Sequence, residues 1–192
     1  MNAPDVKEKR KAWVKTIIEY SPEKLVYLDE SGVNTDMTRI YGRAMGGARA
    51  VDNAPINTPA NTTILSSIRL NGETAYTTYS GGTTGDKFID YMKNVLIPTL
   101  SKGDVIIMDN MRSHHAKAVR EAIEDAEMTL LYLPQYSTDL NPIEQMWSKV
   151  KAVLRKLKIR VSTELPAAIK FAFSLITKED CYGWFNSAGV LG

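Results

Sequence analysis

The chain has 192 residues, of which 44% are apolar and 24% charged, and its net charge is only +2. This is the composition of an ordinary globular domain, and it excludes a disordered or collagen-like chain. No apolar run approaches the ~18 residues that a membrane helix needs, and the charged first residues are unlike a secretory signal. The single cysteine, Cys181, cannot form an internal disulfide, so we expect a reducing, cytoplasmic location.

The first half of the chain is predicted to begin with a helix and to continue as antiparallel β-structure. Residues 1–19 mix both charge signs around apolar positions, which favours a helix or the tail of a preceding segment, and Ser21-Pro22 ends it. The Asn71-Gly72 pair between two β-rich runs predicts a hairpin. We expect strands at residues 25–28, 38–41, 61–70 and 73–79.

The second half alternates between helical spacing and short apolar runs. We expect helices at residues 88–96, 116–126, 141–157 and 164–176, and buried strands at residues 104–109 and 129–133. Trp147 lies on the apolar stripe of the third of these helices, so we predict core packing for it rather than base stacking. The pattern indicates an α/β fold with one mixed central sheet, three antiparallel strands followed by two parallel ones, and helices packed on it.

Three acidic residues stand where separate elements could bring them together. Asp29 and Asp109 each follow an apolar strand, and Glu144 lies in the first turn of a helix that follows a third strand. The carboxyl ends of parallel strands share one edge of a sheet, where ligands bind. Carboxylates that lie close together repel one another unless a cation neutralises them, and Mg²⁺ or Mn²⁺ suits such ligands. Two ions ~3.5–4 Å apart support in-line displacement at a phosphodiester.

Each acid also has a purely structural interpretation, which the residue pattern alone leaves open. Asp29 could end a strand and enter a turn at Ser31-Gly32, and Asp109 could begin a turn of its own. Asn141 as the N-cap, with Glu144 three positions on, would make a capping-box arrangement.

Three segments resemble the signature blocks of the mariner-like DDE transposases, and the bacterial insertion-sequence branch in particular. They are L-V-Y-L-D-E-S-G around Asp29, I-I-M-D-N-M-R-S-H around Asp109 and L-P-Q-Y-S-T-D-L-N-P-I-E-Q-M-W-S around Glu144. The 34 residues that separate Asp109 from Glu144 match the spacing of that branch. The resemblance runs from about Lys24 to the C-terminus.

The resemblance implies a ribonuclease H-like fold in which Asp29, Asp109 and Glu144 hold two divalent ions, Mg²⁺ or Mn²⁺. It implies divalent-metal-dependent DNA strand cleavage and strand transfer in cut-and-paste transposition. We expect residues 1–23 to be a helical lead-in or linker remnant and residues 24–192 to be the catalytic domain. Members of the family carry helix-turn-helix modules ahead of this domain, so we expect a separately encoded N-terminal part. We also expect a homodimer on transposon-end and target DNA, associated with the nucleoid.

Basic residues near the acids are candidate DNA contacts. Six lie between Lys149 and Arg160 with no acidic residue among them, and Lys151 and Arg155 share the helix face of Glu144. A solvated helix face or an ordinary flexible loop would explain the same charges. The candidates are Lys151, Arg155, Arg43, Arg49 and His114, the last because it matches a histidine of the family.

Two other functions remain open at the level of the sequence. The first is a ribonuclease H-like DNA nuclease that does not transpose. The second is a non-catalytic remnant of a transposase that only binds DNA, although the presence of all three acids argues against it.

Overall fold

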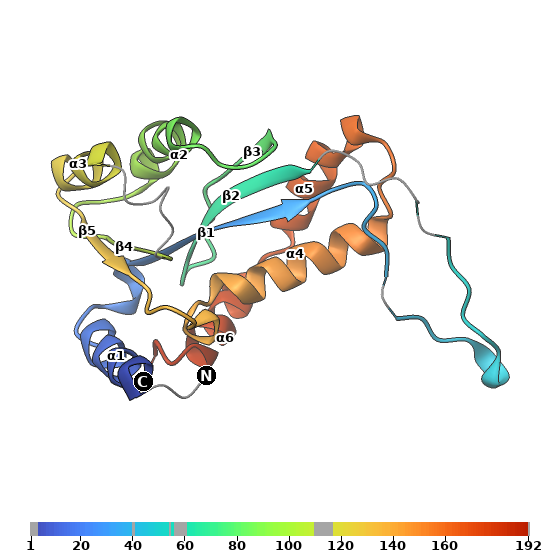
Figure 1. Cartoon of the computed structure of the whole chain (residues 1–192), viewed down its shortest axis with the longest axis horizontal. Coiled ribbons are helices and arrows are strands. Elements are labelled where there is room, and N and C mark those ends of the chain that lie inside the picture. The colour runs from blue at the N-terminus through green and yellow to red at the C-terminus, as the bar shows by residue number, and fades with distance from the viewer. Residues whose placement is uncertain (1–3, 40, 54, 56–60, 110–116, 192) are drawn as a thin grey trace.

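A computed structural model describes residues 4–39, 41–53, 55, 61–109 and 117–191 of the chain (Figure 1). The strands are β1 (Leu25–Val33), β2 (Thr62–Arg69), β3 (Tyr76–Ser80), β4 (Val105–Met108) and β5 (Thr129–Tyr132). The helices are α1 (Pro4–Ile17), α2 (Gly85–Tyr91), α3 (Lys117–Asp125), α4 (Ile143–Leu157), α5 (Leu165–Ser174) and α6 (Lys178–Ser187). Within these ranges, none of the helices is both long and apolar enough to cross a lipid bilayer.

The five strands form one mixed sheet in the order β3-β2-β1-β4-β5. Strands β1, β2 and β3 pair antiparallel, while β4 runs parallel to β1 and β5 parallel to β4. The predicted arrangement of three antiparallel and two parallel strands is therefore confirmed. The predicted hairpin turn is present too, because Gly72 adopts a φ of 92° and its N–H donates to the Arg69 carbonyl at 3.1 Å.

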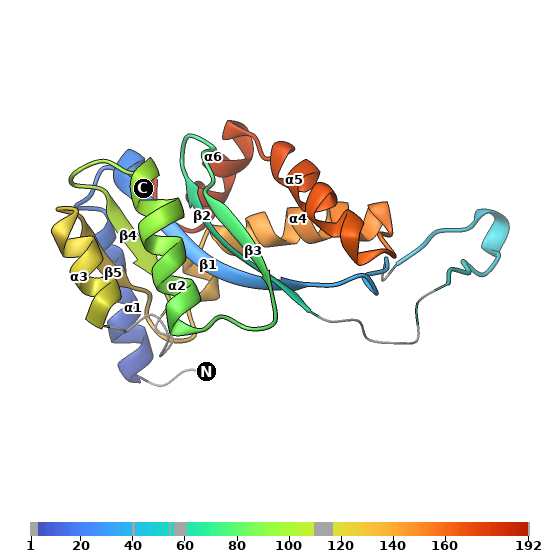
Figure 2. The same cartoon turned by 90° about the horizontal axis from the view of Figure 1, so that it is seen from above.

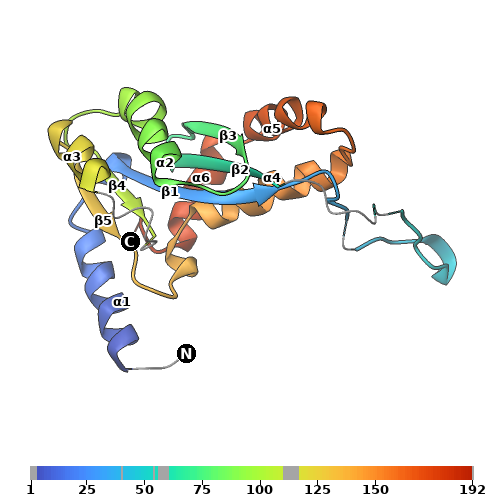
Figure 3. The same cartoon turned by 45° about the horizontal axis from the view of Figure 1, so that its top comes forward.

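The sheet separates two apolar cores. One core joins the sheet to α1, α4, α5 and α6, and the other joins it to α2 and α3 (Figures 2 and 3). Along β1 the side chains alternate, so that Leu25 and Tyr27 enter the first core and Val26 and Leu28 the second. This alternation places the next residue, Asp29, on the α4 face of the sheet.

Helix α4 lies in the first core and brings its N-terminal end close to the edge of the sheet where the parallel strands end. Its buried side chains recur at helical spacing and form one apolar stripe: Ile143, Met146, Trp147, Val150 and Leu154. The core role predicted for Trp147 is thus present, since its side chain is 3% exposed. The helix ends at Leu157, and the next residue, Lys158, adopts the left-handed conformation with a φ of 52°.

Strand β1 is longer than predicted, and the predicted strand at residues 38–41 is wrong. Strand β1 continues to Val33 because β2 pairs with it along that whole stretch. After Val33 the chain leaves the sheet, and the described residues of 38–41 have no regular structure. They have no neighbouring strand to satisfy their backbone groups, and Tyr41 is 89% exposed. Figure 1 shows residues 41–53 extending away from the sheet.

The helices follow the prediction except near the C-terminus. The predicted helix at 88–96 begins earlier, at Gly85, where the Thr84 side chain accepts a hydrogen bond from the Lys87 N–H. Its α-helical part ends at Tyr91, and a π-helical turn follows over Met92–Leu96. The predicted helix at 164–176 ends at Ser174, and a further helix, α6, follows. Helix α6 begins with a capping box formed by Thr177 and Asp180, and it was not predicted.

Helix α1 packs on the body of the protein. Trp13 and Ile17 are buried in the core shared with α4. Arg10 forms a two-pronged ion pair with Asp139, in the turn that precedes α4, and its Nη1 lies 2.8 Å from Asp139 Oδ1. The expected division between a lead-in at residues 1–23 and a catalytic domain at 24–192 stays a prediction.

Candidate active site

The register of the sheet explains why Asp29 and Asp109 lie near each other. The last paired residues of β1 and β4 in the parallel ladder are Leu28 and Met108. Asp29 and Asp109 are the next residue of each strand, so they are neighbours where the ladder ends. Both follow the same alternation, which directs them to the α4 face. The predicted meeting of two strand-end acids at one sheet edge is therefore present.

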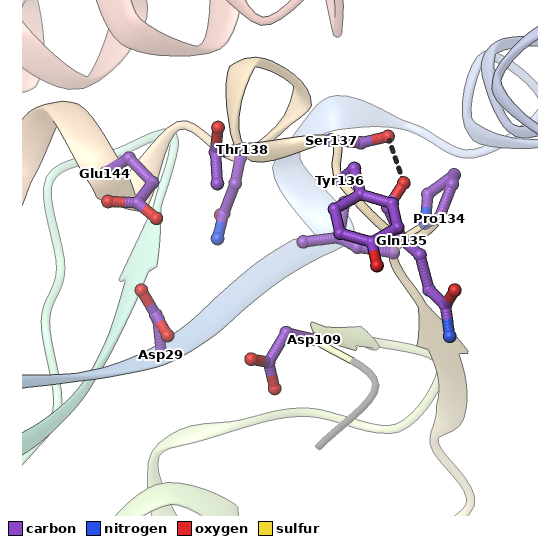
Figure 4. A pocket seen from close by; sticks show the side chains of 10 residues that line it. Asp29, Asp109, Pro134, Gln135, Tyr136, Ser137, Thr138 and Glu144 are labelled. Carbon is purple, nitrogen blue, oxygen red and sulfur yellow. Dashed lines mark hydrogen bonds between the residues drawn. The ribbon is translucent and has the colours of Figure 1, made fainter. Parts of the chain in front are cut away.

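Glu144 reaches the same place from the first turn of α4. All three acids line one open cleft of about 330 Å³. The rest of the cleft wall comes from the segment between β5 and α4: Leu133, Pro134, Gln135, Tyr136, Ser137, Thr138 and Asn141. Figure 4 shows Asp29 between Glu144 and Asp109, with the three carboxylates turned toward a common space.

The cleft disfavours the negatively charged form of Asp29. Burial, which has the largest effect, and the nearby charges of Glu144 and Asp109 together raise the pKa of Asp29 to about 7. Hydrogen bonds from the Glu30 backbone and the Trp147 side chain favour the charged form, but they do not outweigh the burial and the repulsion. A cation bound in the cleft would relieve this repulsion.

The structural interpretations of Asp29 and Glu144 do not hold, while that of Asp109 depends on residues outside the described part of the chain. Asp29 lies inside β1 rather than in a turn. Helix α4 has Pro142 at its N-cap position with no side-chain capping bond, so Glu144 takes no part in a capping box. Asn141, the expected cap, is 5% exposed, and its Oδ1 has no hydrogen-bond partner within the described structure. That amide oxygen belongs to a residue that lines the cleft.

The donor chemistry of the cleft fits a hard divalent ion. Three carboxylates and one amide oxygen are ligand types that Mg²⁺ and Mn²⁺ accept. Among the described residues, no three acidic, histidine or cysteine side chains already surround a single point. Mg²⁺ commonly takes one or two carboxylates and completes its coordination with water and substrate phosphate, so two acids for each ion are enough.

The basic run on α4 divides into two groups. Lys149 pairs with Asp180, Lys158 pairs with Asp52, and Arg160 donates to the backbone carbonyl of Thr35 at 2.9 Å. These three fasten α4 and the segment after it to neighbouring parts of the chain. The two expected DNA contacts on this helix, Lys151 and Arg155, are half-buried and have neither an ion pair nor a hydrogen bond in the described part of the chain.

Two other expected DNA contacts lie away from the three acids. Arg43 and Arg49 line a separate hollow with Arg39 and Lys158, at the far end of α4. His114 lies outside the described residues. The structure therefore brings the three acids together and places the arginine loop at a different site.

The sequence did not predict a role at the cleft for Trp147 or Asn141. Trp147 Nε1 donates a hydrogen bond to Asp29 Oδ2 at 3.0 Å, and Asn141, which lines the cleft, has a buried amide oxygen with no hydrogen-bond partner among the described residues. The one available signal for Trp147 is its position three residues after Glu144, which places it one turn further along α4.

Comparisons with known proteins identify the fold and the family. The chain has a ribonuclease H-like fold, since it superimposes with a TM-score of 0.80 on the Mos1 transposase paired-end complex with left transposon end, at 18% identity. That match covers 98% of this chain and 60% of the Mos1 chain. Residues 24–165 match the family described as DDE superfamily endonuclease, and the chain belongs to that family.

One further relative and a second Mos1 structure are similar to the chain. The Tcb2 transposase of Caenorhabditis briggsae is 32% identical over 79 residues, which cover 38% of this chain and 29% of that protein. The mariner Mos1 paired-end complex with Mg superimposes with a TM-score of 0.79 at 16% identity, covering 98% of this chain and 60% of that one. The chain thus spans less than two thirds of each of these relatives. They support the mariner-like resemblance but give the bacterial insertion-sequence branch no support.

Proposed function

We propose that this chain is the catalytic domain of a cut-and-paste DNA transposase, with Asp29, Asp109 and Glu144 as its catalytic and metal-binding residues. One observation carries the proposal: three acids from β1, the end of β4 and α4 line a single cleft. The family match and the similarity to transposases support it. The bacterial insertion-sequence branch stays a prediction from the 34-residue spacing.

The three acids would hold Mg²⁺ or Mn²⁺, two ions in each site. Bound there, the ions would supply charge neutralisation at the phosphate and would lower the pKa of an attacking water. Asp29 and Asp109, adjacent at the end of the parallel ladder, would share ligation, and Glu144 would complete the coordination of the second ion. A Mos1 complex has been solved with Mg and another with Mn, which supports the choice of ion.

The reaction has two in-line steps at the same acids. In the first, a water oxygen bonds to phosphorus and the DNA 3′-oxygen leaves as a hydroxyl. In the second, that hydroxyl attacks a phosphodiester of target DNA, and the displaced oxygen again takes a proton. By holding the cations, the acids would orient the phosphate for both attacks, because in-line displacement needs attacking and leaving oxygens on opposite sides of phosphorus.

The test is nicking of transposon-end DNA by the wild type and by Asp109→Asn. We expect nicking that requires Mg²⁺ or Mn²⁺ and stops with EDTA, and a fall of about 10³-fold in the variant, because several kcal/mol of charge stabilisation disappear. Gel analysis of end-labelled DNA gives the rates. Equal cutting by the two proteins would contradict the assignment.

A pre-cleaved end separates transposition from simple nuclease activity. We expect the wild type to join a pre-cleaved 3′-hydroxyl end to a target plasmid. Nicking without any joined product would favour the ribonuclease H-like nuclease. DNA binding without nicking, and without a metal-induced rise in melting temperature, would favour the non-catalytic remnant.

Lys151 and Arg155 are proposed to bind the DNA backbone. Replacing both with alanine should weaken binding uniformly across sequences and reduce the slope of log K against log salt by about one for each phosphate that is no longer neutralised. The matched control is Lys156→Ala, an exposed residue of α4 about a third of a turn away from the Glu144 face. Fluorescence anisotropy over a salt series measures the slopes, and an equal fall in the control would contradict the assignment.

A further inference from the structure

We propose that Trp147 is a positioning residue of the active site, whose indole N–H fixes the orientation of the Asp29 carboxylate. The inference rests on the proposed function, because it assigns Asp29 to the metal-binding cleft. The contact itself is direct: Trp147 Nε1 donates to Asp29 Oδ2 at 3.0 Å.

The indole is a rigid donor. Trp147 is 3% exposed, and its ring meets that of Phe173 on α5 edge to face, with 6.2 Å between ring centroids. An indole N–H can only donate, and packing on this scale holds the ring in one orientation. The hydrogen bond therefore holds Oδ2 of Asp29 against the buried indole and leaves Oδ1 available to bind a ligand in the cleft.

The position of Trp147 along α4 couples two of the acids. Glu144 lies three residues earlier on the same helix, so both side chains are carried by adjacent turns of one rigid element. Helix α4 thus supplies one acid and orients another that comes from β1. A shift of α4 relative to the sheet would therefore move Glu144 and, at the same time, break the hydrogen bond between Trp147 and Asp29.

The alternative is that Asp29 merely satisfies a buried indole. A backbone carbonyl or a neutral amide would do so without the cost of burying a charge. Here the acceptor is a largely buried carboxylate that feels two other carboxylates. This choice of acceptor makes sense if the charge itself is needed and the indole serves to hold it.

Groups that orient metal ligands in this way typically contribute 10–100-fold in metal affinity or activity. Trp147→Phe keeps most of the ring volume and removes the N–H. We expect the dissociation constant for Mg²⁺ to rise about 10-fold or more, and nicking to fall by a similar factor at sub-saturating Mg²⁺. Trp184→Phe, on α6, is the matched control and should change neither.

NMR spectra of the ¹⁵N-labelled full chain can detect the contact through the indole N–H signals. This measurement needs neither bound metal nor enzymatic activity. Three tryptophan Nε1–H peaks are expected, and the peak that disappears in Trp147→Phe is that of Trp147. In metal-free protein, Asp29→Asn should shift this peak, because the acceptor changes from a carboxylate to an amide, while the peaks of Trp13 and Trp184 stay in place. Mg²⁺ should shift the same peak in the wild type.

Each outcome decides one of the two proposals. If the Trp147 peak is unchanged by Asp29→Asn, or if Trp147→Phe folds and binds Mg²⁺ with wild-type affinity, the positioning role is wrong. If the wild type binds no divalent ion and nicks no DNA while the peak still responds to Asp29→Asn, the proposed function fails but the hydrogen bond stands. Should Trp147→Phe not fold, the Trp147 peak is the one that remains in both Trp13→Phe and Trp184→Phe, and the Asp29→Asn spectrum still decides.

Discussion

Asp29→Asn should make the metal-free protein more stable while reducing metal-dependent nicking by about 10³-fold or more. Asp29 is largely buried and feels the charges of Glu144 and Asp109, so its ionised form opposes folding when no cation is present. Asparagine keeps an acceptor for the Trp147 N–H and removes the charge. We expect the free energy of unfolding in EDTA at pH 8 to rise by about 1–3 kcal/mol, since each pKa unit corresponds to ~1.4 kcal/mol.

The stability of the metal-free protein should depend on pH through the titration of Asp29. Burial raises the pKa of Asp29 from 3.8 to about 7, so the folded protein binds this proton more tightly than the unfolded chain does. The metal-free wild type should therefore lose stability as the pH rises from about 4 to about 7, and the Asp29→Asn protein should lack this part of the decline. Chemical denaturation in EDTA over a pH series measures both curves.

The control for this experiment is Asp125→Asn, the same chemical change at the exposed end of α3. It should leave nicking unchanged and shift the unfolding free energy by no more than about 0.5 kcal/mol. An Asp29→Asn protein that is less stable than the wild type in EDTA and still nicks DNA would show that Asp29 serves the fold rather than the metal.

Asp104→Ala should cause the largest loss of stability among single substitutions of charged residues. Asp104 is fully buried just before β4 and accepts from Arg69 Nη1 at 2.9 Å and from the Ser101 backbone N–H at 2.9 Å, with Lys24 Nζ at 3.3 Å. Alanine leaves the largely buried Arg69 guanidinium without its counter-charge. We expect a loss of about 3–5 kcal/mol in the free energy of unfolding.

The matched control for Asp104 is the exposed ion pair between Lys102 and Glu127. Lys102→Ala should cost less than about 1 kcal/mol, because exposed pairs contribute little. Urea unfolding monitored by circular dichroism compares the two variants. Asp104 lies at the opposite end of β4 from Asp109, so an Asp104→Ala protein held below its melting temperature should keep its nicking rate. A loss below about 1 kcal/mol would contradict the structural role.

The sheet and its acids could be predicted because they depend on local patterns. Apolar runs that end in Asp29 and Asp109 indicate two central strands, and the alternation of side chains then sets the face on which both acids lie. The Asn71-Gly72 turn and the apolar stripe of α4 are equally local signals. These features need no knowledge of what each element packs against.

The features that were missed depend mainly on distant partners. Strand β1 continues through Ser31-Gly32, a pair typical of a turn, because β2 pairs beside it. Asn141 resembles an N-cap, yet the helix begins one residue later with Pro142 at its cap. The bond from Trp147 to Asp29 spans 118 residues, and no local pattern encodes it. Helix α6 is the exception, because the Thr177–Asp180 capping box is visible in the sequence and would have predicted it.

The two separate cores lie on opposite faces of the sheet, and only one of these faces carries the cleft. All three acids and the basic run belong to the side of α4, while α2 and α3 cover the opposite face. Engineering can exploit this asymmetry: a fluorophore, an affinity handle or a fused targeting module attached to the outer surface of α3 would sit behind the sheet, shielded from the cleft. Such fusions should retain the proposed nicking activity, whereas the same attachment on α4 should weaken it by covering the proposed DNA contacts at Lys151 and Arg155.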